Sequence, residues 1–196
     1  VLEAPKPTDE RRLIGDLCDL IMERDPDVIE NHNLLGFDLP FLFDRATALG
    51  VPLRMGREPA PMLAQRFEDR VTFRRRRGSR FSIAGRELID TLDAVRRHDF
   101  AARDMPGHGL KAAARYFGVA SPDRTYVPGQ EIYSTYRRDP DRVRRYAMDD
   151  VSEVDGLSRA LLGSVFALAG MAPRRYESLA SAGPAMGILE PMLVRA

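Results

Sequence analysis

Several residue types that build special sites are scarce in this chain of 196 residues. It has no tryptophan, one cysteine and three histidines. Cys18 has no cysteine partner, so an intrachain disulfide and a zinc site built on several thiolates are both excluded. His32, His98 and His108 are scattered along the chain, so we interpret them as loop or surface residues rather than metal ligands. No apolar run approaches the ~20 residues that a membrane-spanning helix needs.

The first residue, Val1, is not methionine, and no signal-peptide pattern follows it. We therefore expect a piece of a longer protein. A chain with a single cysteine and no signal pattern also favours a reducing, cytoplasmic setting. The length suits one domain with its own core, and a content of 44% hydrophobic and 30% charged residues is ordinary for a globular protein.

Lysine is scarce as well, since Lys6 and Lys111 are the only lysines among 30 basic residues. The net charge is only +1, so overall charge neither favours nor excludes a nucleic-acid partner. Arginine suits bidentate contacts with phosphate. The coding bias of a GC-rich genome is nevertheless the simpler explanation for most of these arginines.

One stretch, residues 25–42, reads as a strand, a turn and the start of a helix. Val28 and Ile29 are β-branched and follow a proline-containing break, which indicates a short buried strand. Turn-forming residues fill the next positions, and Leu39-Pro40 predicts the start of a helix. Asp38 stands just before that start. It is either an N-cap or a metal ligand at the edge of a sheet, because α/β folds place ligands where strands end.

A second stretch, residues 139–151, predicts a helix that begins at Asp139-Pro140. Tyr146 and Asp150 are four residues apart and therefore share one helix face. The predicted apolar stripe runs beside them through Val143, Ala147, Val151, Val154, Leu161 and Val165. A carboxylate at the margin of a buried stripe is costly unless a partner binds it. Asp150 is therefore a candidate ligand.

The remaining pattern alternates helices, loops and short strands. A strand is expected at residues 87–92, with Asp90 in a structural or supporting role, and a helical turn at 62–67. The run Arg74, Arg75, Arg76 and Arg77 is expected at the tip of a β-hairpin formed by residues 71–83. Such a tip is either a solvated end or a contact for phosphate. Helices are predicted at 8–24, 39–49, 93–99, 110–117, 139–168 and 184–195.

Together these stretches resemble two of the three motifs of the 3′–5′ exonuclease domain of family B DNA polymerases. The second motif of that family is an Asn followed by Phe-Asp-x-Pro, matched here by Asn33 to Pro40, and the third is Tyr-x-x-x-Asp, matched by Tyr146 to Asp150. Residues 85–90, 109–111 and 175–196 also resemble the family. The last of these resembles the segment that leads toward the polymerase core, so we expect an exonuclease-like domain at 1–170 and a connector at 171–196.

The family's first motif, Asp-x-Glu on the first strand of its sheet, occurs nowhere in these residues. The resemblance implies an α/β, RNase H-like fold with a mixed sheet flanked by helices. It also implies that the first strands lie upstream of Val1 and that a β-hairpin is inserted.

The resemblance implies a two-metal site for Mg²⁺ or Mn²⁺, with Asp38 and Asp150 as two of its ligands. Tyr146 is expected to orient the attacking water or the scissile phosphate, and Asn33 and Phe37 to line the groove for the terminal nucleotides. The implied substrate is single-stranded or primer-end DNA, and the implied partner is the rest of a polymerase-like chain. The alternative is a catalytically silent domain that binds DNA or braces such a protein. If the exonuclease interpretation is right, the carboxylates of Asp38 and Asp150 converge.

Overall fold

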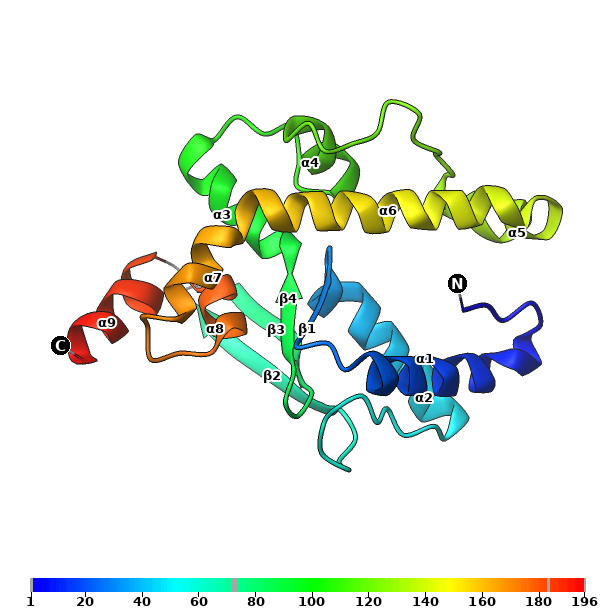
Figure 1. Ribbon diagram of the computed structural model, residues 1–196, viewed down its shortest axis with the longest axis horizontal. Coiled ribbons are helices and arrows are strands. Elements are labelled where there is room, and N and C mark those ends of the chain that lie inside the picture. The colour runs from blue at the N-terminus through cyan, green and yellow to red at the C-terminus, as the bar shows by residue number, and fades with distance from the viewer. Residues whose placement is uncertain (1, 72–73, 183, 196) are drawn as a thin grey trace. The chain divides into compact units, whose positions relative to one another are not determined.

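The computed structural model describes residues 2–71, 74–182 and 184–195, with side chains described in these ranges except at 66–71, 74–79, 184–186 and 195. The chain divides into two compact units, Val1–Asp90 and Thr91–Ala196. Helices and short strands alternate in the first unit, and helices make up the second (Figure 1). The α/β class predicted from the sequence is therefore confirmed. Within the described residues, no helix has both the length and the apolar character needed to cross a membrane.

The first unit opens with a 3-10 turn, Pro7–Asp9, and helix α1, Glu10–Arg24. Asp25 ends α1 in the left-handed conformation, and strand β1, Val28–Asn31, follows. A π-helical turn, Leu34–Asp38, then leads into α2, Leu39–Leu49, which ends at Gly50 with a φ of 63°. Glycine adopts this backbone angle without strain, so the predicted end of α2 is confirmed.

Strand β1 pairs in parallel with β4, Glu87–Asp90. The register sets Val28 beside Glu87 and Asn31 beside Asp90, so the carboxyl ends of both strands meet at one edge. The core of the unit forms between α1, α2 and these strands, and it includes Cys18 as expected. Its buried members also include Ile14, Leu34, Leu39, Ala46, Met55, Ile83 and Leu88.

Strands β2, Leu63–Val71, and β3, Arg74–Ser82, form an antiparallel hairpin. The predicted hairpin is confirmed, but two details of the prediction are wrong. Residues 62–67 form no helical turn because β2 begins at Leu63. The run Arg74 to Arg77 lies within β3 rather than at a tip, and the register sets it opposite residues 68–71 of β2. The register sets Glu68 beside Arg77 and Asp69 beside Arg76.

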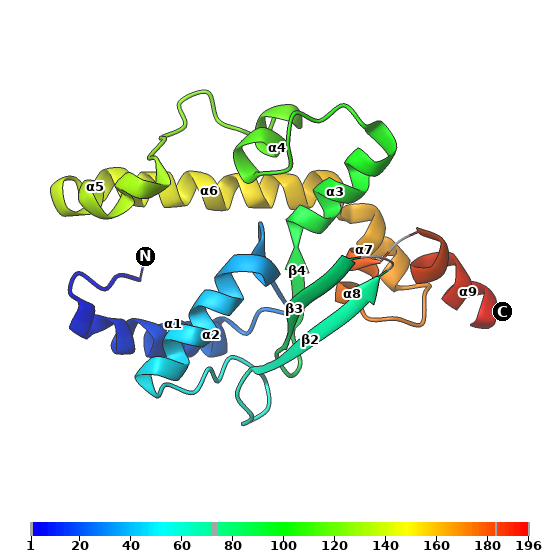
Figure 2. The same ribbon diagram turned by 180° about the vertical axis from the view of Figure 1, so that it is seen from behind.

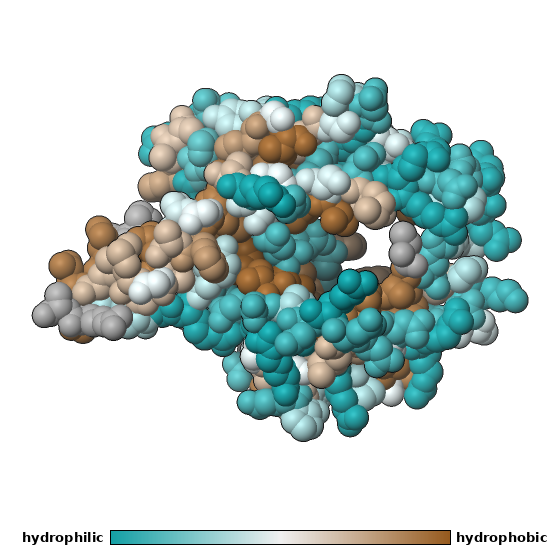
Figure 3. All heavy atoms as spheres, in the orientation of Figure 1, coloured by the Kyte–Doolittle hydropathy of each residue, from teal (hydrophilic) through white to brown (hydrophobic). Residues whose placement is uncertain are grey.

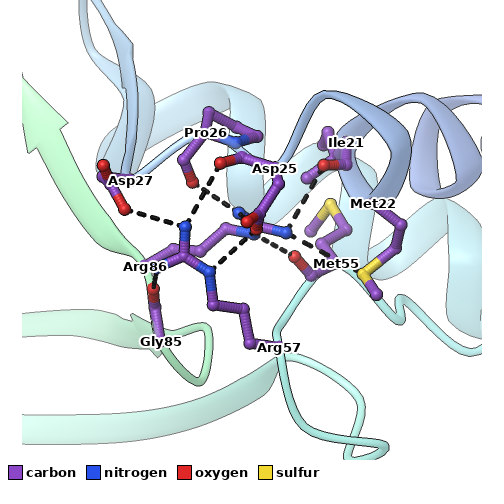
Figure 4. Close-up of polar contacts among 9 residues, drawn as sticks. All are labelled: Ile21, Met22, Asp25, Pro26, Asp27, Met55, Arg57, Gly85 and Arg86. Carbon is purple, nitrogen blue, oxygen red and sulfur yellow. Dashed lines mark hydrogen bonds and ion pairs between the residues drawn. The ribbon is translucent and has the colours of Figure 1, made fainter.

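A buried arginine holds the amino ends of β1 and β4 together (Figure 4). Arg86 is 1% exposed, and its guanidinium donates to the carbonyl oxygens of Pro26 and Met55, each at 2.5 Å, and to Asp25 Oδ1 at 2.9 Å. These bonds tie the end of α1, the start of β1 and the loop before β2 to the start of β4.

Arg57 lies at the surface and binds the same aspartate, Asp25, as Arg86 does (Figure 4). We call Arg57 and Arg86 the arginine cluster. Its guanidinium donates to Asp25 Oδ1 at 2.8 Å, to Asp27 Oδ1 at 2.7 Å and to the carbonyl of Gly85 at 2.9 Å. The hydrogen bonds from Arg57 and then Arg86 lower the pKa of Asp25. The cluster lies at the end of the strand pair opposite to Asn31 and Asp90, so it positions the strands without occupying their carboxyl edge.

The second unit begins with α3, Thr91–Ala102, and α4, Leu110–Tyr116, both of which pack on the long helix α6, Pro140–Leu161 (Figure 2). Val95, Ala113 and Leu157 form the buried centre of this packing. A 3-10 turn, Gly129–Glu131, and α5, Ile132–Arg138, precede α6. Asp139 caps α6 by accepting a hydrogen bond from the Arg142 amide at 3.0 Å, as predicted. The chain continues through α7, Gly163–Ala169, α8, Tyr176–Ser181, a π-helical turn, Pro184–Leu189, and α9, Glu190–Arg195.

The predicted helix of residues 139–168 is divided at Leu162, where α6 ends before α7 begins at Gly163. Glycine has a low helix propensity, which explains a break at this point. The predicted helix at 184–195 is likewise a π-helical turn followed by α9. Strand β4 ends at Asp90, and α3 begins at Thr91 rather than at residue 93.

The predicted apolar stripe of α6 is only partly right. Val154 is buried, but Val151 is 62% exposed. The buried residues of α6 are Glu153, Val154 and Leu157, and Tyr146 and Asp150 lie half-buried on the side of Glu153 and Leu157. Tyr146, Asp150 and Glu153 are polar, so a hydrophobic pattern does not detect this part of the helix.

Candidate functional site

The carboxyl edge of the parallel strands is organised by Asp90. Its carboxylate accepts hydrogen bonds from the amides of Asn33 at 2.8 Å and Leu35 at 3.1 Å, and the residue is 8% exposed. The end of β4 thereby fixes the turn that follows β1. This arrangement agrees with the supporting role expected for Asp90.

The turn itself depends on two residue types. Asn33 has a φ of 67°, a left-handed conformation that asparagine tolerates better than most residues. Its side-chain Oδ1 lies only 2.3 Å from the position that a Cβ of Gly36 would occupy. Gly36 therefore leaves room for the Asn33 side chain, and the spacing of the two residues fits this turn.

Asp38 is the last residue of the π-helical turn and lies at the N-cap position of α2. Its φ of −66° and ψ of −49° are helical, and its side chain makes no capping hydrogen bond. The N-cap interpretation is therefore wrong, because a capping residue needs an extended backbone to reach back to the free amides. Burial, and secondarily the negative charge of Asp90, raise the pKa of Asp38, whereas a hydrogen bond with the Asn31 side chain opposes the rise. The carboxyl edge thus holds two acidic side chains close together.

Phe37 lies beside Asp38 and is 61% exposed. Its ring stacks on that of Phe41, which is 58% exposed, with the centroids 6.1 Å apart and the planes 7° from parallel. Flat rings of this kind can accept nucleobases by stacking. Phe37 was expected from the sequence and Phe41 was not, although the two residues are four apart and so share one side of a helical segment.

In the second unit, α6 carries Tyr146, Asp150 and Glu153 on one side, with Glu153 buried and the other two half-buried. Lys111 of α4 and Arg124 of the following loop both form ion pairs with Asp150 Oδ1. Arg124 also bonds Glu153 Oε1, and Lys111 Nζ lies 3.6 Å from Glu153 Oε2. We call these four charged residues, Lys111, Arg124, Asp150 and Glu153, the charge cluster.

The charge cluster surrounds the ring of Tyr146. The ammonium of Lys111 lies 4.8 Å from the ring centroid and the guanidinium of Arg124 lies 5.4 Å from it, which are cation–π distances. Burial, and then the positive charge of Arg124, lower the pKa of Lys111 to about 8, although Glu153 opposes the shift. Both cations thus stabilise the position of the Tyr146 ring and neutralise Asp150.

The roles of Arg124 and Glu153 were missed from the sequence. Glu153 is 2% exposed, and a fully buried carboxylate three residues from a helical glycine carries no distinctive local pattern. Neighbouring Asp149 accepts a hydrogen bond from the Thr125 amide at 2.7 Å, which fastens the same loop to α6. These contacts join residues 24 to 29 positions apart, which local sequence reasoning cannot pair.

Of the two carboxylates expected to bind metal, only Asp38 has surroundings that suit a metal ligand. Asp38, half-buried and close to Asp90, has the character of a metal-binding carboxylate. Asp150 does not have that character as it stands, because its Oδ1 is shared by two cations. Within the ranges that the structure describes, no group of three or more His, Cys, Asp or Glu residues is arranged to hold a metal ion. Asp38 and Asp150 belong to different units, so their convergence stays a prediction.

The contact of the hairpin arginines with phosphate also stays a prediction. Arg74 to Arg77 lie in β3, and their side chains lie outside the described part of the structure. Asn33 and Phe37 are both placed beside the carboxyl edge of the β1–β4 pair by the turn and the start of α2.

Comparison with known proteins relates this geometry to one family. A sequence model of the DNA polymerase family B exonuclease domain matches residues 6–111. DNA polymerase 1 of Pyrococcus abyssi is 31% identical over 143 residues, which cover 72% of this chain and 17% of that protein. DNA polymerase 2 of Aeropyrum pernix is 31% identical over 170 residues, covering 83% of this chain and 19% of that polymerase.

A solved structure gives the same relationship. The family B DNA polymerase of Pyrobaculum calidifontis aligns with 97% of this chain at a TM-score of 0.73 and 31% identity, and the match covers 23% of the polymerase. The chain thus spans about a fifth of the length of the polymerases that it resembles. On the match of the family's sequence model to more than half of its length, this chain belongs to the exonuclease domain family of the family B DNA polymerases.

Proposed function

We propose that this chain is part of a 3′–5′ exonuclease domain that hydrolyses phosphodiester bonds at DNA 3′ ends, as in proofreading during replication or repair. One observation in particular supports the proposal. A half-buried carboxylate, Asp38, stands at the carboxyl edge of the β1–β4 pair beside Asp90 and the exposed ring of Phe37. Open α/β sheets bind ligands at this edge.

Each site residue has a distinct proposed role. Asp38 and Asp150 are two carboxylate ligands for Mg²⁺ or Mn²⁺, completed by acidic residues outside this chain, and a bound divalent ion would neutralise charge at the scissile phosphate. Tyr146 orients the attacking water or that phosphate through its hydroxyl. The two cation–π contacts that hold its ring support this role.

Asn33 and Phe37 line the path of the terminal nucleotides. Phe37 presents an exposed ring on which a base can stack, and the Asp90 hydrogen bond fixes the backbone of Asn33. Arg74, Arg75, Arg76 and Arg77 are proposed to contact phosphates of single-stranded or primer-end DNA.

The second proposed partner is the rest of a polymerase-like chain. Leu189, Leu193 and Val194 are 58%, 74% and 82% exposed, and hydrophobic side chains gather over the C-terminal helix α9 in Figure 3. Adjacent apolar residues left in solvent mark interaction surfaces. They support a connector role for residues 171–196. We place such a DNA-handling protein in the cytoplasm.

The charge cluster favours a second candidate function. Because Asp150 is neutralised by Lys111 and Arg124, the same fold could serve as a catalytically silent domain that binds DNA or braces a polymerase. The coding sequence upstream of Val1 separates the two candidates most cheaply. A strand carrying Asp-x-Glu there supports the exonuclease, whereas its absence supports the silent domain.

The test uses a longer chain that includes such an upstream segment. With Mn²⁺ present, it is expected to shorten 5′-labelled single-stranded DNA from a free 3′ end and to spare DNA whose 3′ end is blocked. Asp38→Ala is expected to stop the reaction and leave DNA binding largely intact. Asp44→Ala is the matched control, since Asp44 is an exposed carboxylate on the same helix. A longer chain that binds DNA and never cuts it overturns the exonuclease proposal.

A further inference from the structure

One end of the second unit leaves two tyrosine rings in solvent. Tyr126 is 56% exposed and lies in the loop that leads through the 3-10 turn Gly129–Glu131 into α5, where Tyr133 is 76% exposed. Two positions along, on the opposite side of α5, Thr135 is buried, so Tyr133 lies on the outward side of the helix. Figure 1 shows this loop and α5 at the end where α6 begins.

The backbone that carries these rings is fixed to α6. The Thr125 amide donates a hydrogen bond to Asp149 Oδ2 at 2.7 Å, and Arg142 Nη2 donates to the carbonyl oxygen of Tyr126 at 3.3 Å. Helix α5 also packs on α6. The tyrosines are therefore presented by ordered backbone, which reduces the entropy that is lost when a partner binds.

Arginines are concentrated at the same end of the unit. Arg137, Arg138, Arg142 and Arg145 are all exposed. Arg137 is four residues from Tyr133 and shares its side of α5, and Arg142 and Arg145 are three residues apart and share one side of α6. The exposed tyrosines thus lie in segments that also present guanidinium groups.

Little negative charge offsets these arginines. Residues 124–145 contain three carboxylates, at Glu131, Asp139 and Asp141. Asp139 accepts the hydrogen bond of the Arg142 amide as the cap of α6, and Asp141 pairs with Arg144 at 2.6 Å. The remaining excess of positive charge attracts anionic partners.

We propose that this end of the second unit binds a single strand of nucleic acid, with bases stacked on the tyrosine rings and phosphates held by the guanidinium groups. Base–aromatic stacking accepts any base, and arginine makes bidentate contacts with phosphate. An acidic protein would use the arginines but not the flat rings, so the combination favours a nucleic-acid strand. We call this site the tyrosine–arginine surface, and it comprises Tyr126, Tyr133, Arg137, Arg138, Arg142 and Arg145.

The tyrosine–arginine surface goes beyond the proposed exonuclease, because it belongs wholly to the second unit and requires neither metal nor cleavage. The experiment measures binding of fluorescein-labelled oligothymidine to the 196-residue chain in EDTA by fluorescence anisotropy. Tyr133→Ser is expected to weaken binding about fivefold or more, because one stacking ring is lost. Tyr133→Phe keeps the ring and is expected to bind as the parent does. Phe100→Ser is the matched control, since Phe100 of α3 is 75% exposed in the same unit.

Two further measurements separate base stacking from charge. The double variant Arg137→Ser, Arg145→Ser is expected to reduce the salt slope of binding by about 0.7 per lost phosphate contact. Arg159→Ser, at a side chain on α6 that is 79% exposed, is expected to leave the slope unchanged. An abasic strand of the same length carries phosphates without bases, so Tyr133→Ser is expected to leave its binding unchanged.

A strand that carries 5-iodouracil locates the contact directly. Irradiation is expected to cross-link it to Tyr126 or Tyr133, identified by mass spectrometry of the digested chain. The proposal is overturned if the cross-links are confined to residues 1–90, or if Tyr133→Ser binds oligothymidine as tightly as the parent. Equal affinity for normal and abasic strands also overturns it, and indicates a surface for any polyanion, such as an acidic protein. A longer chain that fails to cut DNA refutes the proposed exonuclease and leaves these outcomes unaffected.

Discussion

At the scale of single residues, the function of Asp38 and its contribution to stability oppose each other. The residue lies where burial and the charge of Asp90 disfavour its ionised form, and its backbone prevents a capping role that would offset the cost. A carboxylate held in such a place is destabilising unless a cation meets it. Residues of this kind are expected at functional sites, where local stability is lost in favour of chemistry.

The pH dependence of stability tests this account. The pKa of Asp38 is raised in the folded chain, so the folded state binds its proton more readily than the unfolded state does. At a pH above both pKa values both states are ionised, and the folded state bears the full penalty. The penalty disappears as pH falls through the raised pKa toward the unfolded value of about 3.9.

Asp38→Asn is therefore expected to raise the melting temperature at pH 7, because the amide carries no charge to bury. The advantage should shrink as the pH is lowered through the titration of Asp38. Melting curves of parent and variant from pH 7 to pH 4 measure this difference, with Asp44→Asn as the control on the same helix. A destabilised Asp38→Asn chain at pH 7 would show that the carboxylate is structurally required.

At the scale of elements, the β1–β4 pair is held from one end so that the other end remains available for a ligand. The arginine cluster fixes the amino ends through Arg86 and Arg57, and Asp90 fixes the turn at the carboxyl ends. The two arginines contribute unequally. Arg86 is buried and satisfies two carbonyls, whereas the side chain of Arg57 is 39% exposed and screened by water.

Arg86→Met is expected to lower the free energy of unfolding by about 3 kcal/mol, because buried carbonyls of Pro26 and Met55 lose their donor. Arg57→Met removes a similar number of hydrogen bonds at the surface and is expected to cost much less. Urea denaturation of the two variants measures the contrast. Equal losses would mean that the buried guanidinium has no special role.

The hairpin provides another test at this scale, because the arginine run lies within a strand. Residues of a strand alternate between its two faces, so Arg74 and Arg76 share one face and Arg75 and Arg77 share the other. Only one of these pairs is expected to meet a DNA backbone. We expect one double Arg→Ser variant to flatten the salt dependence of single-stranded DNA binding, by about 0.7 in slope per lost contact.

The matched double Arg→Ser variant on the other face is the control for that measurement. It should leave the slope close to that of the parent, since its arginines face away from the nucleic acid. Fluorescence anisotropy titrations at several salt concentrations give both slopes. Identical slopes in parent and both variants would indicate that the run only solubilises the hairpin.

At the scale of the whole molecule, the sequence predicts those features that depend on neighbouring residues alone, such as helix ends and turns. Asp139 before a proline defines a helix start, Gly50 a helix end, and Cys18 a core position, and all three are found as expected. The turn from Asn33 to Asp38 was placed correctly because its glycine, asparagine and proline have strong backbone preferences.

Contacts between distant polar residues were not predictable in the same way. Glu153 and Arg124 meet across a loop, and neither hydrophobic periodicity nor residue type marks such a pair. The stripe of α6 was only partly predicted for the same reason, since Glu153 is buried through its ion pair with Arg124 and no hydrophobic pattern marks it. A polar side chain is buried where it finds hydrogen-bond partners, and the hydrophobic pattern of the sequence does not show where those partners are.

The proposal that Asp38 and Asp150 both serve DNA cleavage is the one to test most directly. The most direct measurement is a double-mutant cycle on the rate of 3′-end degradation by the longer chain that includes an Asp-x-Glu strand. Groups that act as one unit are strongly non-additive. Asp38→Ala, Asp150→Ala and the double variant are therefore all expected to lose activity to a similar extent, on the order of 10²-fold or more. An Asp150→Ala chain that still degrades DNA at the parent rate, while Asp38→Ala does not, would contradict the claim.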